Sequence, residues 1–297
     1  MNLKDWCIEW VKVYKRLTLK SSTYDSYITY CGYINCDIDI VDVKSIDIQC
    51  IINKLIVRGC SYSTVKHALV ILRGALRKAY VLHMIDDLSC LDNLELPKSS
   101  VRKIYSLSAR DIDAVLASDS HFNYVFEFLL LSGLRVGELI ALRWCDIDFC
   151  NKLMYVRNTD YKGKLQRVKT DNGERVIPLT GRMFDIVSDL ALRPRSDRVF
   201  LNSRGTMIKY TTLRDAWLRV CKSSNITPCG LHVLRHTFAR RSLRMGVPVN
   251  VVSAWLGHAD ISITLRIYDD IDIEDMKSAA LLINTMYNKS SSSELLA

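Results

Sequence analysis

Several features that mark membrane or secreted proteins are absent from this chain of 297 residues. No apolar run approaches the ~18 residues needed to span a bilayer, so we expect no transmembrane helix. The first residues lack the basic and then apolar pattern of a signal peptide, so we expect no secretion. The ten cysteines are therefore interpreted as reduced thiols of a cytoplasmic protein rather than as disulfides.

A zinc-binding cysteine pattern is also absent. No C-x-x-C pair occurs, and the closest spacings, Cys31 to Cys36 and Cys145 to Cys150, are wider than a usual zinc knuckle. We therefore expect no metal site. The composition that is present, 49% hydrophobic and 25% charged, is that of a globular protein, and the net charge of +9 favours a nucleic-acid partner.

The pattern of the chain predicts two domains joined by a linker. Residues 1–96 are expected to form a helical domain, and a proline, paired serines and three cations indicate a linker at 97–104. Residues 105–287 are expected to combine helices with a few strands, and 288–297 to form a flexible tail. Most of the excess positive charge follows the linker. The expected fold class is mainly α with a small antiparallel β-sheet (α+β).

One predicted helix of the first domain, 63–80, carries two distinct faces. Apolar residues recur along it at helical spacing, whereas Lys66, Arg73 and Arg77 share another face. That face is either simply solvated or a strip that contacts DNA, and both interpretations stay open. The candidate DNA-binding residues of the whole chain are Lys66, Arg73, Arg77, Arg240 and Arg244.

Local signals also predict elements in the second domain. Ser108, with a carboxylate three residues later, is expected to cap a helix, and Gly133 to let the chain turn between two helices. The Asp-Asn-Gly at 171–173 predicts a hairpin turn that pairs a strand at 166–170 with one at 175–179.

The residues able to carry chemistry fall in four short stretches. Arg135 lies within L-S-G-L-R-V-G-E, and His232 and Arg235 stand three apart in L-H-V-L-R-H. His258 ends W-L-G-H, and Tyr268 follows it by ten residues. A set of cationic donors followed by one tyrosine is what attack on a phosphodiester needs.

Each of these residue types has a place in such an attack. Arg135 and Arg235 suit the anionic phosphate because guanidinium is always charged, planar and bidentate. His232 lies at i, i+3 to Arg235 on a predicted helix, so both side chains could hold one phosphate. Tyr268 would be the nucleophile, although a phenol with a pKa of ~10 needs nearby cations and a proton acceptor.

Two further residues complete the candidate site. Lys169, on an arm of the predicted hairpin, could protonate the departing 5′ oxygen, and Lys162 and Lys164 are alternatives. Glu138 follows Arg135 by three residues and could orient its guanidinium, or the two could form a simple surface salt bridge.

This order and spacing resemble the tyrosine recombinases, the phage integrase family. The second domain carries nearly all of the likeness, in stretches at 129–146, 168–179, 231–240, 247–258 and 264–268. The first domain resembles the family's helical core-binding domain. Two departures stand out: Thr227-Pro228 is separated from His232 by three residues, and the acidic pair Asp269-Asp270 follows the tyrosine.

The resemblance implies a site-specific recombinase that needs no cofactor and no metal. Two domains would form a C-shaped clamp on duplex DNA, and Tyr268 would form a 3′-phosphotyrosyl link that a partner strand's 5′-hydroxyl reverses. Four protomers would act through a Holliday junction and exchange a C-terminal helix at 271–286, with a possible accessory DNA-bending protein. We expect no membrane partner and a cytoplasmic, nucleoid-associated location.

Several alternatives stay open at this point. The chain is expected to have no additional N-terminal domain for arm-type sites, which favours a Xer-like recombinase or the integrase of a mobile element. A catalytically inactive DNA-binding regulator on the same scaffold is an alternative. A type IB topoisomerase, which has related chemistry, is another.

Overall fold

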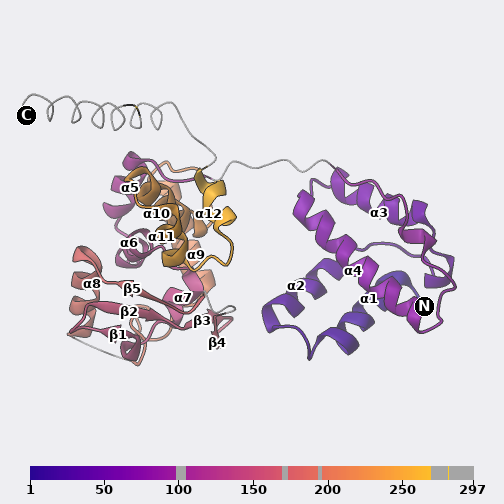
Figure 1. Cartoon of the computed structure of the whole chain (residues 1–297), viewed down its shortest axis with the longest axis horizontal. Helices are drawn as coiled ribbons and strands as arrows, with labels where there is room; N and C mark the ends of the chain where they lie inside the picture. Colours follow the sequence, from indigo (N-terminus) through magenta and orange to yellow (C-terminus); the bar gives the residue numbers. More distant parts are fainter. Residues whose placement is uncertain (98–104, 169–172, 193–195, 269–279, 281–297) are drawn as a thin grey trace, which may run out of the picture. The chain divides into compact units, whose positions relative to one another are not determined.

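The computed structural model describes residues 1–97, 105–168, 173–192, 196–268 and 280 (Figure 1). Main-chain packing divides the chain into two compact units. We call Met1–Arg102 the N-terminal unit and Lys103–Ala297 the C-terminal unit. Each unit has an apolar core of its own.

The N-terminal unit is a group of helices packed around α4. Its α-helices are α1 (Leu3–Trp10), α2 (Ser21–Cys31), α3 (Ser45–Val57) and α4 (Tyr62–Val81). Ser61 caps α4, and the apolar positions of α4 are buried at helical spacing as predicted, from Val65 to Ala79. Trp6 of α1 fixes the packing, because its Nε1 donates a buried hydrogen bond to the Ala75 carbonyl at 2.8 Å.

The C-terminal unit contains eight α-helices and five strands among its described residues. The helices are α5 (Ala109–Leu116), α6 (Asn123–Ser132), α7 (Val136–Ala141), α8 (Gly181–Ala191), α9 (Tyr210–Ser223), α10 (His232–Arg244), α11 (Val249–Leu256) and α12 (Ile261–Tyr268). The strands are β1 (Ile147–Asp148), β2 (Leu153–Val156), β3 (Asn158–Tyr161), β4 (Lys164–Arg167) and β5 (Arg175–Pro178). The predicted fold class, mainly α with small antiparallel sheets, is confirmed.

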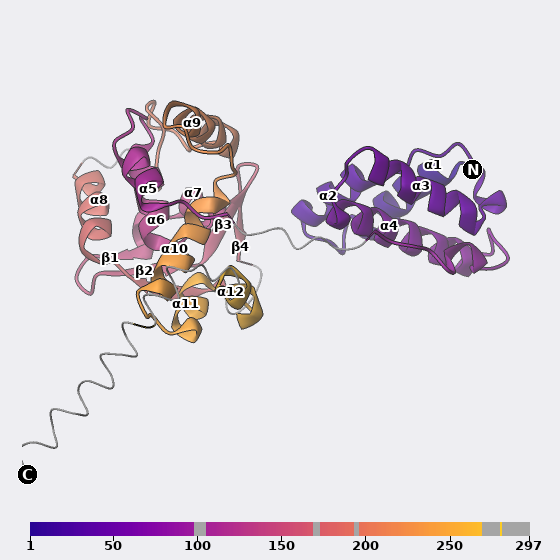
Figure 2. The same cartoon turned by 90° about the horizontal axis from the view of Figure 1, so that it is seen from above.

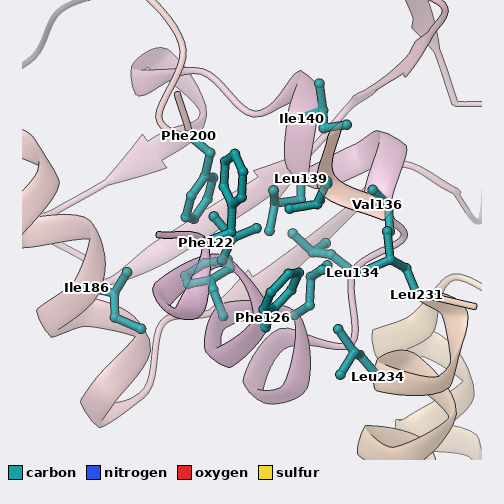
Figure 3. Packing of buried hydrophobic residues seen from close by; sticks show 14 of the residues in the cluster. Phe122, Phe126, Leu134, Val136, Leu139, Ile140, Ile186, Phe200, Leu231 and Leu234 are labelled. Atoms are coloured by element: carbon teal, nitrogen blue, oxygen red, sulfur yellow. The ribbon is translucent and has the colours of Figure 1, made fainter. Parts of the chain in front are cut away.

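The core of the C-terminal unit is built around α6 (Figure 3). Phe126 meets the Trp217 ring of α9 edge-on, with centroids 5.2 Å apart. Phe128 packs against Phe200 at 4.9 Å. Ser108 caps α5 with a reciprocal capping box, as the sequence predicted. These aromatic contacts hold α6 rigidly, and the chain that leaves α6 leads directly to the candidate site.

The predicted hairpin between 166–170 and 175–179 is wrong in its pairing. In the described part of the chain, β4 pairs with β3, and β5 pairs with β2, whose other neighbour is β1. The turn between β3 and β4 is Lys162-Gly163, and both residues have positive φ, 52° and 81°. Two positive φ values are what a two-residue hairpin turn requires, and Lys-Gly signals it less clearly than Asn-Gly. The hairpin turn was therefore predicted at 171–173, where the turn signal in the sequence is stronger.

Helices α10, α11 and α12 pack against one another on one side of this unit (Figure 2). Gly133 lies where α6 approaches α10 and α11. It ends α6 in the left-handed conformation, with a φ of 64°. A Cβ at Gly133 would lie 2.5 Å from the Phe238 ring of α10 and 2.9 Å from Leu256 of α11. The predicted turn at Gly133 is confirmed, and the glycine also permits this close packing. The helix predicted after it is shorter than expected and ends at Ala141.

Among the described residues, we find no helix that is both long enough and apolar enough to cross a membrane.

Candidate active site

Three arginines from three different elements meet at the C-terminal end of α11. Their main-chain acceptors are consecutive: Arg175 Nε donates to the Trp255 oxygen at 2.6 Å, Arg235 Nη2 to the Leu256 oxygen at 2.6 Å, and Arg135 Nη2 to the Gly257 oxygen at 3.4 Å. The last carbonyls of a helix have no partner within the helix, and this end of the helix dipole attracts cations. The end of α11 is therefore a natural anchor for guanidinium groups.

Arg135 stands at the N-cap of α7, where Glu138 holds it twice. The Arg135 amide donates to Glu138 Oε2 at 2.9 Å, and its Nη1 donates to Oε1 at 2.7 Å. The Arg135 side chain is 41% exposed, whereas that of Glu138 is only 1% exposed. The burial of Glu138 rules out a simple surface salt bridge, and the exposed part of Arg135 can reach a ligand.

Glu138 lies between two arginines. Arg175 Nη2 contacts its Oε2 at 2.8 Å, and Arg175 Nη1 its Oε1 at 3.3 Å. Burial raises the pKa of Glu138, but the hydrogen bond and charge of Arg175, together with Arg135, outweigh it and leave the pKa below the ordinary carboxyl value. Glu138 is thus a charged carboxylate at neutral pH, able to fix both guanidinium groups.

Arg235 is almost completely buried, with 2% of its surface exposed. It sits in the first turns of α10, and its Nη1 donates to the Gly133 carbonyl at 2.9 Å. Burial, followed by the charge of Arg135, lowers the pKa of Arg235 to about 9. That value still lies above neutral pH, so Arg235 keeps its charge in a poorly solvated place.

Two histidines of α10 lie beside this arginine. His232 is the first residue of α10, and its ring meets the His236 ring edge-on with centroids 4.6 Å apart. Burial, with His236 and Arg235, lowers the pKa of His232 to about 4. Burial and Arg235 also lower the pKa of His236. Both rings are therefore mainly uncharged at pH 7, because partial burial, followed by the neighbouring charges, disfavours an added proton even though His232 keeps an exposed surface.

His258 follows the left-handed Gly257, whose φ of 67° ends α11. Its Nδ1 shares a hydrogen bond with the hydroxyl of the buried Thr264 at 2.8 Å. Burial, followed by Arg235 and Arg135, lowers the pKa of His258 to about 4. His258 is thus a third imidazole that is mainly uncharged at pH 7, and its Nδ1 is held by the Thr264 hydroxyl.

The structure brings together five of the predicted site residues, which are Arg135, Glu138, His232, Arg235 and His258. Lys169 lies outside the described residues, as does the predicted helix at 271–286 apart from residue 280. Tyr268 is the last residue of α12, and its side chain is likewise not described. The main chain of α12 nevertheless packs against α10 and α11, which carry the histidines.

The remaining predicted residues lie on surfaces. Lys66, Arg73 and Arg77 are exposed on α4, and Arg244 is exposed near the end of α10. Arg240 is half-buried, and its Nη1 approaches the Ser106 hydroxyl at 3.3 Å.

Sequence reasoning missed Arg175 and His236. Arg175 begins the strand that was predicted at 175–179 and is observed at 175–178, but its contacts lie 37 and 80 residues away along the chain. Arg175 could have been indicated by its charge and by its place at the start of a strand that follows the candidate lysine. His236 adjoins the predicted H-x-x-R pair and could have been found by its i, i+4 spacing from His232.

The phage integrase family model matches residues 96–274, which is more than half of the chain. The chain belongs to the phage integrase family. It is 26% identical to a tyrosine recombinase XerC-like protein of Caldanaerobacter subterraneus subsp. tengcongensis, over 97% of this chain and 84% of the relative. It is 30% identical to the tyrosine recombinase XerA of Pyrococcus horikoshii, over 66% of this chain and 67% of the relative. The XerC of Bifidobacterium longum is matched over only 48% of its own length.

Solved structures of integrases share the fold of this phage integrase family member. The Tn1549 transposon integrase, in complex with a circular intermediate DNA, superposes with a TM-score of 0.79 at 18% identity and covers 95% of this chain and 99% of its own. A lambda integrase dimer bound to a COC′ core site superposes with a TM-score of 0.75 at 20% identity, over 92% and 81%. The family and the enzyme class expected from the sequence, tyrosine recombinase, are confirmed.

Proposed function

We propose that this protein is a site-specific DNA recombinase that cleaves and rejoins DNA strands through a 3′-phosphotyrosyl intermediate. The observation that carries the proposal is the convergence of Arg135, Arg235 and two neutral histidines at the end of α11. One carboxylate and several guanidinium groups leave an excess of positive charge there, which suits a phosphodiester. Relatives named as recombinases support the same activity.

The two arginines would neutralise the scissile phosphate. Arg135 presents a partly exposed guanidinium that Glu138 and Gly257 hold in place, so little reorganisation is needed when the phosphate binds. Arg235 is buried, where its charge acts through a medium of low polarity and is screened little by water. Together they would stabilise the additional negative charge of the pentacoordinate transition state.

The neutral histidines would serve as hydrogen-bond and proton partners. A pKa of about 4 keeps His232 and His258 uncharged at pH 7, so each ring has one N–H donor and one acceptor nitrogen. Tyr268 would pass its phenolic proton to one of these rings as its oxygen bonds to phosphorus. The bond from phosphorus to the 5′ oxygen would break in the same step.

The departing 5′ oxygen would take a proton from a lysine. Lys169 is our first candidate, and Lys162 and Lys164, on the β3–β4 hairpin, are the alternatives. This hairpin packs so closely against α7 that a Cβ at Gly137 would lie 2.5 Å from the Thr159 hydroxyl oxygen. The hairpin is therefore held beside Arg135, at a place from which a lysine side chain can approach the same phosphate.

Duplex DNA with a specific recombination site would be the substrate. The exposed cations of α4, Lys66, Arg73 and Arg77, would contact the phosphate backbone, with Arg240 and Arg244 adding contacts from the C-terminal unit. Both units would contribute contacts to the same duplex. The solved neighbours include integrases in complex with DNA, which supports this partner.

The active assembly would be a tetramer on a Holliday junction, in which each protomer passes a C-terminal helix at 271–286 to its neighbour. A solved lambda integrase tetramer bound to a Holliday junction supports this assembly. A groove of about 380 Å³ between α5, α6 and α10, with Leu130 and Phe238 among its residues, offers an apolar surface to such a helix. An accessory bending protein and a cytoplasmic, nucleoid-associated location belong to the same proposal.

The experiment that tests the function is covalent trapping on nicked duplexes tiled across the DNA beside the gene. Wild type and Tyr268→Phe are compared on a denaturing gel. We expect an adduct with wild type only, and equal DNA binding by both proteins. An adduct that persists in Tyr268→Phe would show that another residue attacks. Salt-sensitive binding with no adduct on any duplex would instead indicate an inactive DNA-binding regulator, and relaxation of supercoils without a specific site a topoisomerase.

A further inference from the structure

Arg175 makes more side-chain hydrogen bonds than Arg135 or Arg235, yet it is turned away from solvent. It opens β5, pairs with Val156 of β2, and has a side chain that is only 6% exposed. Its Nε donates to the Trp255 carbonyl at 2.6 Å, and its Nη1 to the Gly173 carbonyl at 3.1 Å. Its two terminal nitrogens also hold both oxygens of Glu138.

These contacts join two elements that carry the proposed chemistry. On one side, Glu138 holds the main chain and the guanidinium of Arg135. On the other, the Trp255 carbonyl belongs to the last turn of α11, which leads directly to His258. A single planar guanidinium thus sets the position of α7 relative to the end of α11.

We propose that Arg175 is a positioning residue of the strand-cleavage reaction, which fixes Arg135 through Glu138 and fixes His258 through the end of α11. The inference rests on the proposed recombinase function. Arg175 does not itself touch the DNA phosphate, because its side chain is nearly buried and its nitrogens already contact protein oxygens. Arg135, with its exposed guanidinium, does so.

The geometry explains why this position needs arginine and not simply a cation. The acceptors lie on two sides of the side chain, one a main-chain oxygen of α11 and the other a carboxylate of α7. A guanidinium offers five N–H donors in a rigid plane, whereas a lysine ammonium is a compact charge on a flexible chain. Lysine at 175 therefore keeps the charge beside Glu138 but cannot hold Glu138 and Trp255 together.

The decisive variant is Arg175→Lys, with Arg182→Gln as the matched control. Arg182 of α8 forms an exposed ion pair with Glu127 of α6 and takes no part in the proposed site. We measure DNA affinity and the single-turnover rate of adduct formation on a nicked duplex. A misplacement of about 1 Å at an active site can lower a rate by ~10²-fold. For Arg175→Lys we expect a loss of this size with little change in affinity, and no change for the control.

Two further measurements separate positioning from a general loss of structure. The rate of adduct formation is measured for Glu138→Gln, for Arg175→Lys and for the double variant. The two losses of rate should not multiply in the double variant, because both substitutions act through the same contact. The His258 ring is titrated by NMR, and in Arg175→Lys its pKa should rise from about 4 towards its ordinary value as the end of α11 loosens and water enters.

Each outcome decides between positioning and its alternatives. A wild-type cleavage rate in Arg175→Lys would overturn the inference, and so would equal losses of rate, affinity and thermal stability, which would indicate a structural role only. Losses that multiply in the double variant would also overturn it. If no protein forms an adduct but the His258 titration still responds to Arg175→Lys, the proposed recombinase function fails while the link from Arg175 to the end of α11 is retained.

Discussion

Helix α4 of the N-terminal unit and the candidate active site of the C-terminal unit present their positive charges in opposite ways. On α4 of the N-terminal unit, Lys66, Arg73 and Arg77 are exposed above a fully apolar core. In the C-terminal unit, Arg175 and Arg235 are buried and donate to chosen oxygen atoms. Exposed cations attract a polyanion from any direction, whereas buried ones act at one point and in one geometry. We therefore expect loss of an exposed cation to weaken binding gradually, and loss of a buried one to stop the chemistry.

The buried side of this contrast gives the largest expected effect. Arg235→Ala removes a guanidinium that donates to Gly133 and Leu256 and leaves both carbonyls without it. Loss of one preorganised donor to a developing charge commonly costs ~10²–10³ in rate. We expect single-turnover cleavage to fall by that factor while DNA affinity falls much less. A drop in affinity as large as the drop in rate would show that Arg235 acts in DNA binding, as the exposed cations do, and would contradict the proposed difference between the two groups.

Replacing the buried carboxylate should affect folding as well as chemistry. Glu138→Gln leaves Arg135 and Arg175 facing each other without a negative charge between them. Breaking a buried ion pair by removing one partner is strongly destabilising, and we expect a loss of about 2–3 kcal/mol in the free energy of unfolding. Urea denaturation measures it, with Glu127→Gln, which breaks the exposed pair with Arg182, as the control. Equal losses for the two variants would contradict the burial argument.

The two site histidines, of which His232 is partly exposed and His258 half-buried, predict a pH dependence of stability. The folded-state pKa values of His232 and His258 are about 4, below their ordinary value of 6.5. The unfolded chain therefore binds protons first as the pH falls. The stability from these groups is fully present above pH 6.5 and decreases as the pH drops towards about 4. Thermal melts between these limits measure the decrease, and the double variant His232→Gln with His258→Gln should flatten it.

Substitutions of the exposed cations on α4 should have the smallest effect per residue. Replacement of Lys66, Arg73 or Arg77 by alanine should weaken DNA binding a few-fold each. It should also reduce the slope of log affinity against log salt by ~1 for each phosphate that is no longer neutralised. Cleavage of DNA that is already bound should not change. Fluorescence anisotropy at several salt concentrations measures the slope. An unchanged slope in the triple variant would leave this face of α4 as a simply solvated surface.

Local patterns in the sequence predicted several helices and some of their ends, although the helix after Gly133 is shorter than expected. The apolar spacing of α4, the cap at Ser108 and the left-handed glycine at 133 all depend on residues within a few positions of one another. The strand pairing was wrong because β5 pairs with β2 across the inserted β3–β4 hairpin. Local turn signals cannot reveal such a pairing.

For the candidate site too, local patterns were predicted and long-range contacts were not. The spacing of the motifs brought Arg135, His232, Arg235 and His258 to attention, and the family resemblance gave them a common chemistry. The place of Arg175 depends instead on Trp255, a residue 80 positions further along the chain. Whether Glu138 was buried or superficial could not be decided either, because burial is a property of the packed core and not of the i, i+3 spacing.

The anchors at the end of α11 have a consequence for how this site tolerates mutation. Its three arginines are received by main-chain oxygens of residues 255, 256 and 257, and a main-chain oxygen survives every substitution. Substitutions at Trp255 and Leu256 therefore leave the acceptor atoms themselves in place, although the Trp255 ring also donates to the Ser132 oxygen and Leu256 is fully buried. Gly257 has no such latitude, because its φ of 67° disfavours other residues. Each anchor therefore depends on the side chain of its arginine, and the course of the chain after α11 depends on Gly257.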